Sequence, residues 1–335
     1  MLKKDKYIGC LIGGAAGDAL GFAVEFSTYN GIVYRYGKDG ICNYDLTDGK
    51  AIISDDTQMT LFTADGILRC VMDGSRDYLK YIHRSYLDWL KTQKGRESVP
   101  VPDCSPLLNV PELNAHRAPG NTCLGALSSG TAGTVDRPIN DSKGCGGVMR
   151  VAPIGLLGDK KMSIDDADML AAQAAALTHG HDLGYIPAAA LAHIIRLTVN
   201  GADLKYAVCD SIEAMKRLFP SAPHLDEFTD ICEAAIELSG GNMPDLSAIK
   251  KLGEGWVAEE TLAIAIYCAL KYENDFERAI IASVNHDGDS DSTGAVTGNI
   301  LGAYLGVNRI PHKFIDNLEL KNLIEDTAIN LYKSF

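Results

Sequence analysis

The sequence predicts an all-α protein that folds as a single compact many-helix domain over residues 1–335. Three observations lead to this prediction: helical periodicity recurs along most of the chain, strand-like segments are few and short, and no obvious linker divides it. The length alone would allow one large domain or two ordinary ones. Hydrophobic residues make up 46% and charged residues 22% of the chain, a composition that suits a substantial buried core.

The helices are predicted from apolar residues that recur every three or four positions. The clearest case is 76–93, where Tyr86 and Trp89 fall on the same face of the expected helix. Short strands are expected at 31–36 and 50–53. Further helices are expected near 6–21, 57–72, 165–179, 184–198, 203–218, 225–239, 259–273, 275–284, 293–306 and 315–333.

Charge and cysteine usage exclude several classes of protein. The net charge of −13 argues against general nucleic-acid binding, which needs clustered Lys and Arg. No apolar run reaches the roughly 20 residues that span a bilayer, and Asp18 and Glu25 interrupt the N-terminal candidate for a signal peptide. The nine cysteines are odd in number and show no C-x-x-C spacing, which indicates reduced thiols rather than disulfides or a zinc site. We therefore expect a cytoplasmic protein without a membrane partner.

Two acidic clusters stand at the predicted starts of apolar helices. In the first, SDDT, Ser54 is a good N-cap, and Asp55 and Asp56 fall in the first helical turn. Taken alone, these carboxylates would only offset the positive end of the helix. In the second, HDGDSDSTG, Asp289 and Asp291 are two residues apart and would point the same way from an extended segment. An EF-hand loop is disfavoured there because the glutamate required at its twelfth position is absent.

The pairing of the two clusters indicates a metal centre. Buried carboxylates without partners are too costly to keep ionised. If the two helix starts meet in the fold, hard divalent cations would balance four carboxylates, and serine hydroxyls would complete the oxygen ligands. Such an oxygen-rich site suits Mg²⁺ or Mn²⁺ and can hold two ions.

Other polar residues are candidates for the same site. Glu25 has apolar neighbours, and a carboxylate near a metal can bind it through water or act as an acid or base. Asp18 is expected to make a helix or turn hydrogen bond. The long irregular stretch 94–150 ends in glycines, and the backbone N–H groups of 144–148 are expected to bind a pyrophosphate. His179 either caps a helix C-terminus or contacts a sugar or phosphate.

Two further residues of the glycine-rich region are expected to have structural roles. Cys145 is expected to be a small packed thiol, because no histidine or other base is tied to it by spacing. Arg150 is expected to make a structural ion pair, and a phosphate contact is its second interpretation.

Taken in order, the segments GDALG-x-x-x-EF, S-D-D-T-x-M, G-C-G-x-x-M-R, T-H and H-x-G-D-S-D-S-T-G resemble the motifs of the ADP-ribosylglycohydrolase family. The resemblance extends from about residue 6 to residue 306. It implies an all-α fold, a centre of two Mg²⁺ or Mn²⁺ ions, and hydrolysis of an ADP-ribosyl bond. The expected substrate is a mono-ADP-ribosylated protein, and the expected product is ADP-ribose.

Carried over position by position, the resemblance implies a complete set of site residues. The implied metal ligands are Ser54, Asp55, Asp56, Asp289, Asp291 and Ser292. Asp55 and Asp291 are implied to be catalytic, Asp291 as the bridge between the ions, and Glu25 matches a glutamate that assists catalysis. The implied substrate contacts are the diphosphate at Gly144, Cys145, Gly146, Gly147 and Val148, the ribose or phosphate at His179, and the adenosine end at Asn121 and Thr122.

Two segments, DSDSTG and PGNTC, resemble the ADP-ribosylarginine hydrolase branch, so we expect an arginine-linked substrate. Asp287 departs from the family pattern, which has glycine at that position, and is expected to lie outside the first ligand shell or point away. The alternatives are another ADP-ribosyl linkage (serine, nucleic acid or free O-acyl-ADP-ribose), another binuclear-metal hydrolase such as a phosphoesterase, or a non-catalytic ADP-ribose binder comparable to a lens crystallin. We expect a monomer.

Overall fold

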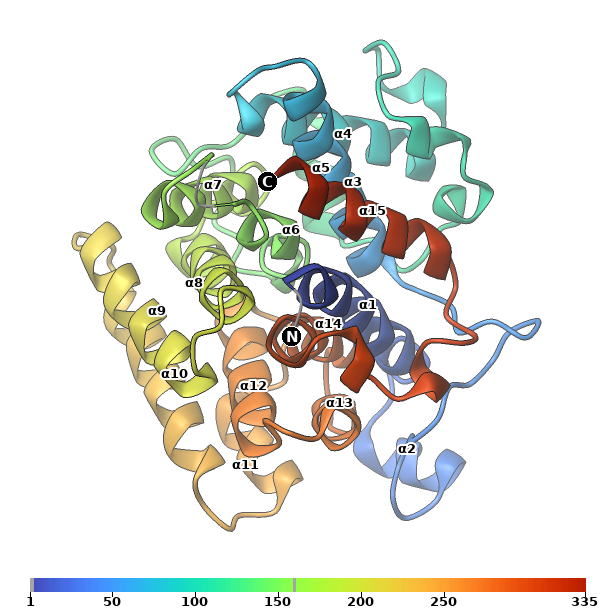
Figure 1. Cartoon of the computed structure of the whole chain (residues 1–335), viewed down its shortest axis with the longest axis vertical. Helices are drawn as coiled ribbons and strands as arrows, with labels where there is room; N and C mark the ends of the chain where they lie inside the picture. The colour runs from blue at the N-terminus through green and yellow to red at the C-terminus, as the bar shows by residue number, and fades with distance from the viewer. Residues whose placement is uncertain (1–2, 159–160) are drawn as a thin grey trace.

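Helices supply the regular structure of the protein, as the computed structural model of residues 3–158 and 161–335 shows (Figure 1). The α-helices of these described residues are α1 Lys3–Gly21, α2 Tyr29–Tyr36, α3 Asp55–Met72, α4 Tyr78–Lys94, α5 Asn121–Ser128, α6 Ala152–Gly155, α7 Ile164–Ala176, α8 Asp182–Val199, α9 Leu204–Leu218, α10 Leu225–Ser239, α11 Asp245–Leu252, α12 Ala258–Lys271, α13 Phe276–Val284, α14 Ser290–Leu305 and α15 Lys321–Ser334. Short 3₁₀ helices lie at Arg96–Ser98, Pro106–Asn109, Pro111–Asn114, Cys145–Gly147, Val307–Arg309 and His312–Phe314.

The all-α prediction is confirmed, and each predicted helix corresponds to an observed one. The two predicted strands are wrong. The segment 31–36 lies in α2, because the Thr28 side chain accepts a hydrogen bond from the N–H of Gly31 and starts a helix that overrides the β-branched residues. The segment 50–53 forms only isolated bridges, antiparallel between Lys50 and Thr47 and parallel between Ala51 and Leu318, because the chain enters α3 soon after them.

Helices α1 and α14 lie side by side at the centre of the molecule, and α8, α12 and α13 pack against α14 (Figure 1). The two central helices run antiparallel and approach so closely that a Cβ on their facing glycines would overlap the backbone of the other helix. The facing pairs are Gly9 with Gly302, Gly13 with Gly298, Gly17 with Gly294, and Gly21 with Ser290. This register places the start of α14 beside the end of α1.

A single hydrophobic core surrounds this central pair. It includes residues from widely separated helices, among them Ile12, Phe62, Trp89, Leu191 and Ile300, all fully buried. Because the core is continuous, the polar helix starts that face away from it are held in fixed positions. In the described parts of the chain, none of the helices is both long enough and apolar enough to cross a bilayer.

The glycine contact predicts how the fold responds to an added methyl group. Gly17→Ala should lower the free energy of unfolding by about 1–3 kcal/mol, because its Cβ would overlap the carbonyl oxygen of Gly294. The matched control is Gly125→Ala in α5, where a Cβ meets no atom within 4 Å and the change should be neutral or slightly stabilising. Urea unfolding of both variants measures the difference, and equal midpoints would contradict the prediction.

Candidate functional site

The start of α3 is held in place by a buried carboxylate from α1. Asp18 is fully buried and accepts hydrogen bonds from the N–H of Ser54 at 3.0 Å, from the N–H of Thr57 at 3.1 Å and from the Thr57 hydroxyl. The Ser54 hydroxyl, as the N-cap, accepts from the N–H of Asp56 at 3.2 Å. Asp18 therefore makes the helix-start hydrogen bonds predicted for it.

The start of α14 is built by a second cap. The Asp289 side chain accepts from the N–H of Ser292 at 3.3 Å, and its own N–H donates to the Glu254 carbonyl at 2.8 Å. Gly288, just before it, has a φ of 131°, a left-handed conformation that glycine adopts without strain. Asp289, Asp291 and Ser292 are all buried.

The two helix starts converge on one cavity of about 460 Å³. Its wall includes these predicted site residues: Glu25, Asp55, Asp56, Asn121, Thr122, Gly144, Cys145, Gly146, His179, Asp289, Asp291 and Ser292. Ser54, Gly147 and Val148 are buried and do not line it. The 94–150 stretch is attached to the acidic cluster by the N–H of Gly120, which donates to the Asp55 carboxylate at 3.2 Å.

The acidic cluster carries more negative charge than its protein surroundings can balance. Carboxylate oxygens of Glu25, Asp289 and Asp291 all lie within 4.8 Å of one another. Oxygen Oε2 of Glu25 and Oδ2 of Asp56 are buried without a hydrogen-bond partner in the described protein. None of the described residues that line the cavity is a lysine or arginine.

Burial raises the pKa of each of these carboxyl groups, and for all but Asp291 the neighbouring carboxylates raise it further. Burial, and then the neighbouring carboxylates, raise the pKa of Glu25 to about 10 and that of Asp18 to about 7. For the same two reasons the pKa values of Asp55, Asp56 and Asp289 lie well above the usual range. A divalent cation would remove this repulsion and satisfy the orphaned oxygens, so the donor set fits hard cations.

The opposite wall is formed by the glycine-rich segment, where fewer N–H groups are free than the sequence predicted. The N–H of Gly144 donates to the Ser142 hydroxyl, and those of Cys145 and Val148 donate to backbone carbonyls. Gly146 and Gly147 lie within the short 3₁₀ helix Cys145–Gly147, and of the two only Gly146 lines the cavity. The pyrophosphate contact expected at 144–148 stays a prediction, with the N–H groups of Gly144, Cys145 and Val148 already used by the protein.

His179 lines the cavity as a neutral ring. Its Nδ1 lies 2.8 Å from the Thr178 hydroxyl, and burial together with the charge of Arg150 lowers its pKa to about 3. A neutral ring cannot act as the cation expected at a helix C-terminus, so the contact with a ligand is the interpretation that the geometry favours.

Arg150 is fully buried, and the ion pair predicted for it is wrong. Its guanidinium donates to the Thr178 hydroxyl at 2.7 Å, to the Ala174 carbonyl at 3.0 Å and to the Cys123 sulfur at 3.2 Å, and it stacks 4.4 Å from the Tyr86 ring centroid. These neutral partners stabilise the cation through hydrogen bonds to its two terminal nitrogens and through the aromatic face, while Nε has no hydrogen-bond partner in the described protein. Through Thr178, Arg150 supports the position of His179.

Two aromatic residues at the mouth of the cavity were not predicted. Phe26 and Trp256 stack with ring centroids 6.1 Å apart, and 76% of Phe26 and 39% of Trp256 is exposed. Both residues, with Glu25, also line a second cavity of about 860 Å³. The one indication in the sequence that these residues are exposed is that Phe26 lies next to a polar motif. Asp287 points away from the cluster and accepts from the N–H of Tyr29 at 2.7 Å.

Comparisons with known proteins agree with this geometry. A family model described as ADP-ribosylglycohydrolase matches residues 1–335. The chain is 28% identical to human ADP-ribosylhydrolase ARH3 over 58% of this chain and 59% of that protein. It is 24% identical to ADP-ribosylarginine hydrolase Tri1 of Pseudomonas putida over 98% of this chain and 78% of that protein. A solved structure titled ADP-ribosylglycohydrolase-related protein complex superposes with a TM-score of 0.66 at 25% identity, covering 99% of this chain and 98% of the other.

Because the carboxylates are crowded, we expect Asp291→Asn to raise the stability of the metal-free protein and to lower the stability gained from bound metal. In EDTA at about pH 7, Asp291→Asn should unfold at a higher urea concentration than the wild type, because it removes the charge that raises the pKa of Asp55, Asp56 and Asp289. The difference should grow as the pH rises from about 4 to about 7, because a raised carboxyl pKa destabilises the folded state in that window.

Magnesium should reverse the order. Excess Mg²⁺ should stabilise the wild type by about 2.7 kcal/mol at one hundred times its dissociation constant, and should stabilise Asp291→Asn much less. Asp287→Asn is the matched control, because this exposed acid of the same motif faces Tyr29. A wild type that shows no response to Mg²⁺ or Mn²⁺ would contradict the interpretation as a metal centre.

Proposed function

Because the chain belongs to the ADP-ribosylglycohydrolase family, we propose that it is a Mg²⁺- or Mn²⁺-dependent hydrolase that removes ADP-ribose from a modified arginine of a protein. The observation that carries the proposal is the convergence of two buried acidic helix starts and Glu25 on one cavity. The donor atoms are oxygens without a basic counter-charge, which suits a hydrolase that works with hard cations.

Two cations would be held by side chains at the two helix starts: Ser54, Asp55, Asp56, Asp289, Asp291 and Ser292. When bound, such ions supply positive charge that balances the carboxylates and orients the hydroxyl groups of a ribose. The hydrogen bonds that Asp18 accepts from Ser54 and Thr57 fix the start of α3, so the ligands on α3 are positioned before a cation arrives.

Different side chains of the protein would then carry out different parts of the reaction. Cleavage of the bond between the anomeric carbon and nitrogen passes through an oxocarbenium-like state, which nearby carboxylates stabilise. Glu25 would hold a water molecule against the anomeric carbon and accept its proton. It can do so because cations beside it would lower the pKa that is raised without them.

The far wall would hold the rest of the ADP-ribose. Gly146 and the neutral ring of His179 lie side by side at the cavity wall and would contact the diphosphate. Asn121 and Thr122 start α5 at the same wall and would contact the adenosine end.

Arginine is proposed as the linked residue on two grounds. The DSDSTG and PGNTC segments resemble the arginine-specific branch, and a relative that matches nearly the whole chain is named an ADP-ribosylarginine hydrolase. The human relative carries a different name, so another ADP-ribosyl linkage is the second candidate. All nine cysteines are unpaired, which supports the expected cytoplasmic location.

Removing a proposed ligand should abolish turnover. Asp55→Ala and Asp291→Ala should release no ADP-ribose above background from an ADP-ribosylarginine protein in Mg²⁺, whereas the control Asp287→Ala should retain wild-type activity. The same assay on serine-linked and nucleic-acid-linked ADP-ribose, with and without EDTA, identifies the linkage.

Other outcomes of this assay point to the alternatives. Turnover that persists in EDTA would contradict the metal-dependent mechanism. AMP as the product would indicate a phosphoesterase, and ADP-ribose binding without turnover of any linkage would indicate a binding protein.

Glu25→Gln should separate catalysis from binding. The amide keeps the size of the side chain but cannot accept the proton, so kcat should fall by about 10²–10⁴-fold. The stabilisation by Mg²⁺ and the affinity for ADP-ribose should be retained. Steady-state kinetics, calorimetry and urea unfolding measure the three quantities, and an unchanged kcat would exclude Glu25 as the base.

A further inference from the structure

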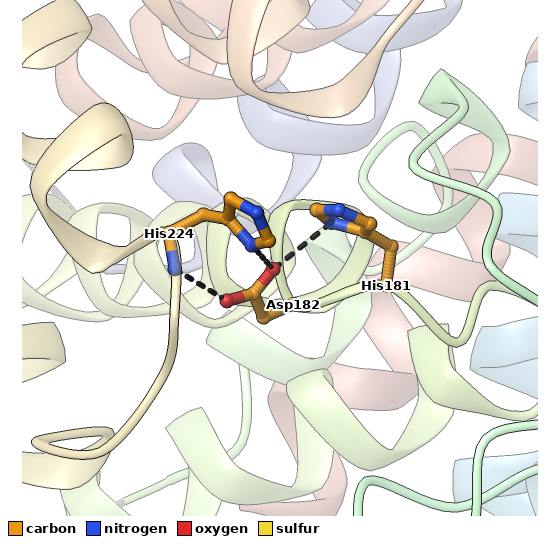
Figure 2. A group of neighbouring side chains, drawn as sticks. All are labelled: His181, Asp182 and His224. Atoms are coloured by element: carbon orange, nitrogen blue, oxygen red, sulfur yellow. Dashed lines mark hydrogen bonds and ion pairs between the residues drawn. The ribbon is translucent and has the colours of Figure 1, made fainter.

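A second group of potential metal ligands lies at the starts of α8 and α10. Asp182 is the first residue of α8, His181 is its N-cap, and His224 stands at the N-cap position of α10. Figure 2 shows both imidazole rings turned toward the Asp182 carboxylate. Nδ1 of His181 lies 2.9 Å and Nδ1 of His224 lies 2.8 Å from the same oxygen, Oδ1.

Backbone groups already hold the carboxylate in this orientation. The N–H of His224 donates to Oδ2 of Asp182 at 2.8 Å, and the N–H of Leu183 donates to Oδ1 at 2.9 Å. Backbone donors of this kind orient the carboxylate of a metal site. The two rings are therefore not needed to fix Asp182, yet both direct a nitrogen at its Oδ1.

The hydrogen bonds at His181 show how a cation would be accommodated. The N–H of Leu183 lies 3.1 Å from Nδ1 of His181 as well as 2.9 Å from the Asp182 oxygen. If Nδ1 of His181 accepts the Leu183 N–H, this nitrogen carries a lone pair and no hydrogen. The lone pair then lies close to the Asp182 carboxylate oxygen, and the two repel each other. A metal ion between them would take up both lone pairs, and Leu183 would keep its bond to Asp182.

We propose that His181, Asp182 and His224 bind a transition-metal dication of the Zn²⁺ class, separate from the acidic cluster. Two imidazole nitrogens and one carboxylate oxygen suit Zn²⁺, Co²⁺ or Ni²⁺ and disfavour Mg²⁺. Bonds of about 2.0–2.1 Å place tetrahedral ligand atoms about 3.3 Å apart, so each ring nitrogen would move outward by about half an ångström from its 2.8–2.9 Å distance to Oδ1. The three donor atoms lie within 4.8 Å of one another, so small ring rotations complete the site.

The surroundings leave a coordination position for water and favour a cation. The side chain of His224 is 44% exposed and that of His181 is 16% exposed, so solvent reaches the group. The positive ends of α8 and α10 oppose a cation, but Asp182 itself and Asp226 and Glu227 in the first turn of α10 offset them.

The site lies behind the wall of the main cavity. The N–H of His181 donates to the Ser142 carbonyl at 3.3 Å, and the N–H of Gly180 donates to the Asn140 side chain at 3.0 Å. His179, two residues before His181, lines the cavity. A bound ion would join the starts of α8 and α10 and so brace the segment that supports the glycine-rich wall.

The experiment is a titration of the full-length protein with Co²⁺ in excess Mg²⁺, which occupies oxygen-only sites. The wild type should bind one Co²⁺ with visible d–d absorption and without a thiolate charge-transfer band, and Zn²⁺ should displace it. His224→Ala should weaken binding by about tenfold or more. His181→Gln provides a second test if His224→Ala folds poorly. His312→Ala is the matched control, because His312 is 92% exposed and faces only Asp316 at 3.9 Å.

The position of the bound metal ion is determined from a crystal soaked in Zn²⁺. An anomalous peak between the two rings and Asp182 supports the proposal. It is overturned if the wild type binds no Co²⁺, if His224→Ala binds as tightly as the wild type, or if the peaks lie only at exposed cysteines such as Cys104 and Cys209. None of these outcomes depends on ADP-ribose hydrolysis, so the metal site and the proposed activity are tested separately.

Discussion

The backbone contact between α1 and α14 determines the architecture on which the site depends. Glycines on both helices allow their main chains to touch, and side chains larger than hydrogen on the facing positions would separate them. The contact fixes both the antiparallel direction and the register of the two helices. Because Gly21 faces Ser290, the acidic start of α14 lies beside the end of α1, from which Asp18 reaches the start of α3. Helix packing, and not attraction between charged groups, therefore determines where the carboxylates lie.

The charge arrangement that results is unfavourable in the protein alone. Hydrophobic packing forces Asp55, Asp56, Asp289 and Asp291 into a buried space without a lysine or arginine among its described lining residues. Water cannot solvate them fully, and each raises the pKa of its neighbours. Asp18 accepts several hydrogen bonds from backbone and hydroxyl groups, whereas Asp55 and Asp289 each accept a backbone N–H from outside their own residue and keep repelling neighbours. Folding therefore brings mutually repelling carboxylates together at one place, and a bound cation would reduce their repulsion.

Much of this could be predicted from the sequence, because the local signals agree with the fold. Ser54 and the two aspartates after it form a capping pattern, and apolar periodicity identifies the long helices. Other features depend on distant contacts that no local pattern contains. The segment 31–36 has a strand-like sequence, and only the cap at Thr28 shows that it belongs to a helix. Arg150 is expected from the sequence to pair with an acid, and only the fold shows that its neighbours are a sulfur, a hydroxyl and an aromatic ring. The small residues of α1 indicate close approach, but not that α14 is the partner.

The pairing of the first helix with the penultimate long helix has a consequence for how the protein is made. On the ribosome, α1 is made long before α14, and its glycine face has no partner until α14 has been translated. Contacts of such wide sequence separation form slowly, because a long loop must close before they contribute. The acidic pocket can therefore assemble only after α14 has been translated.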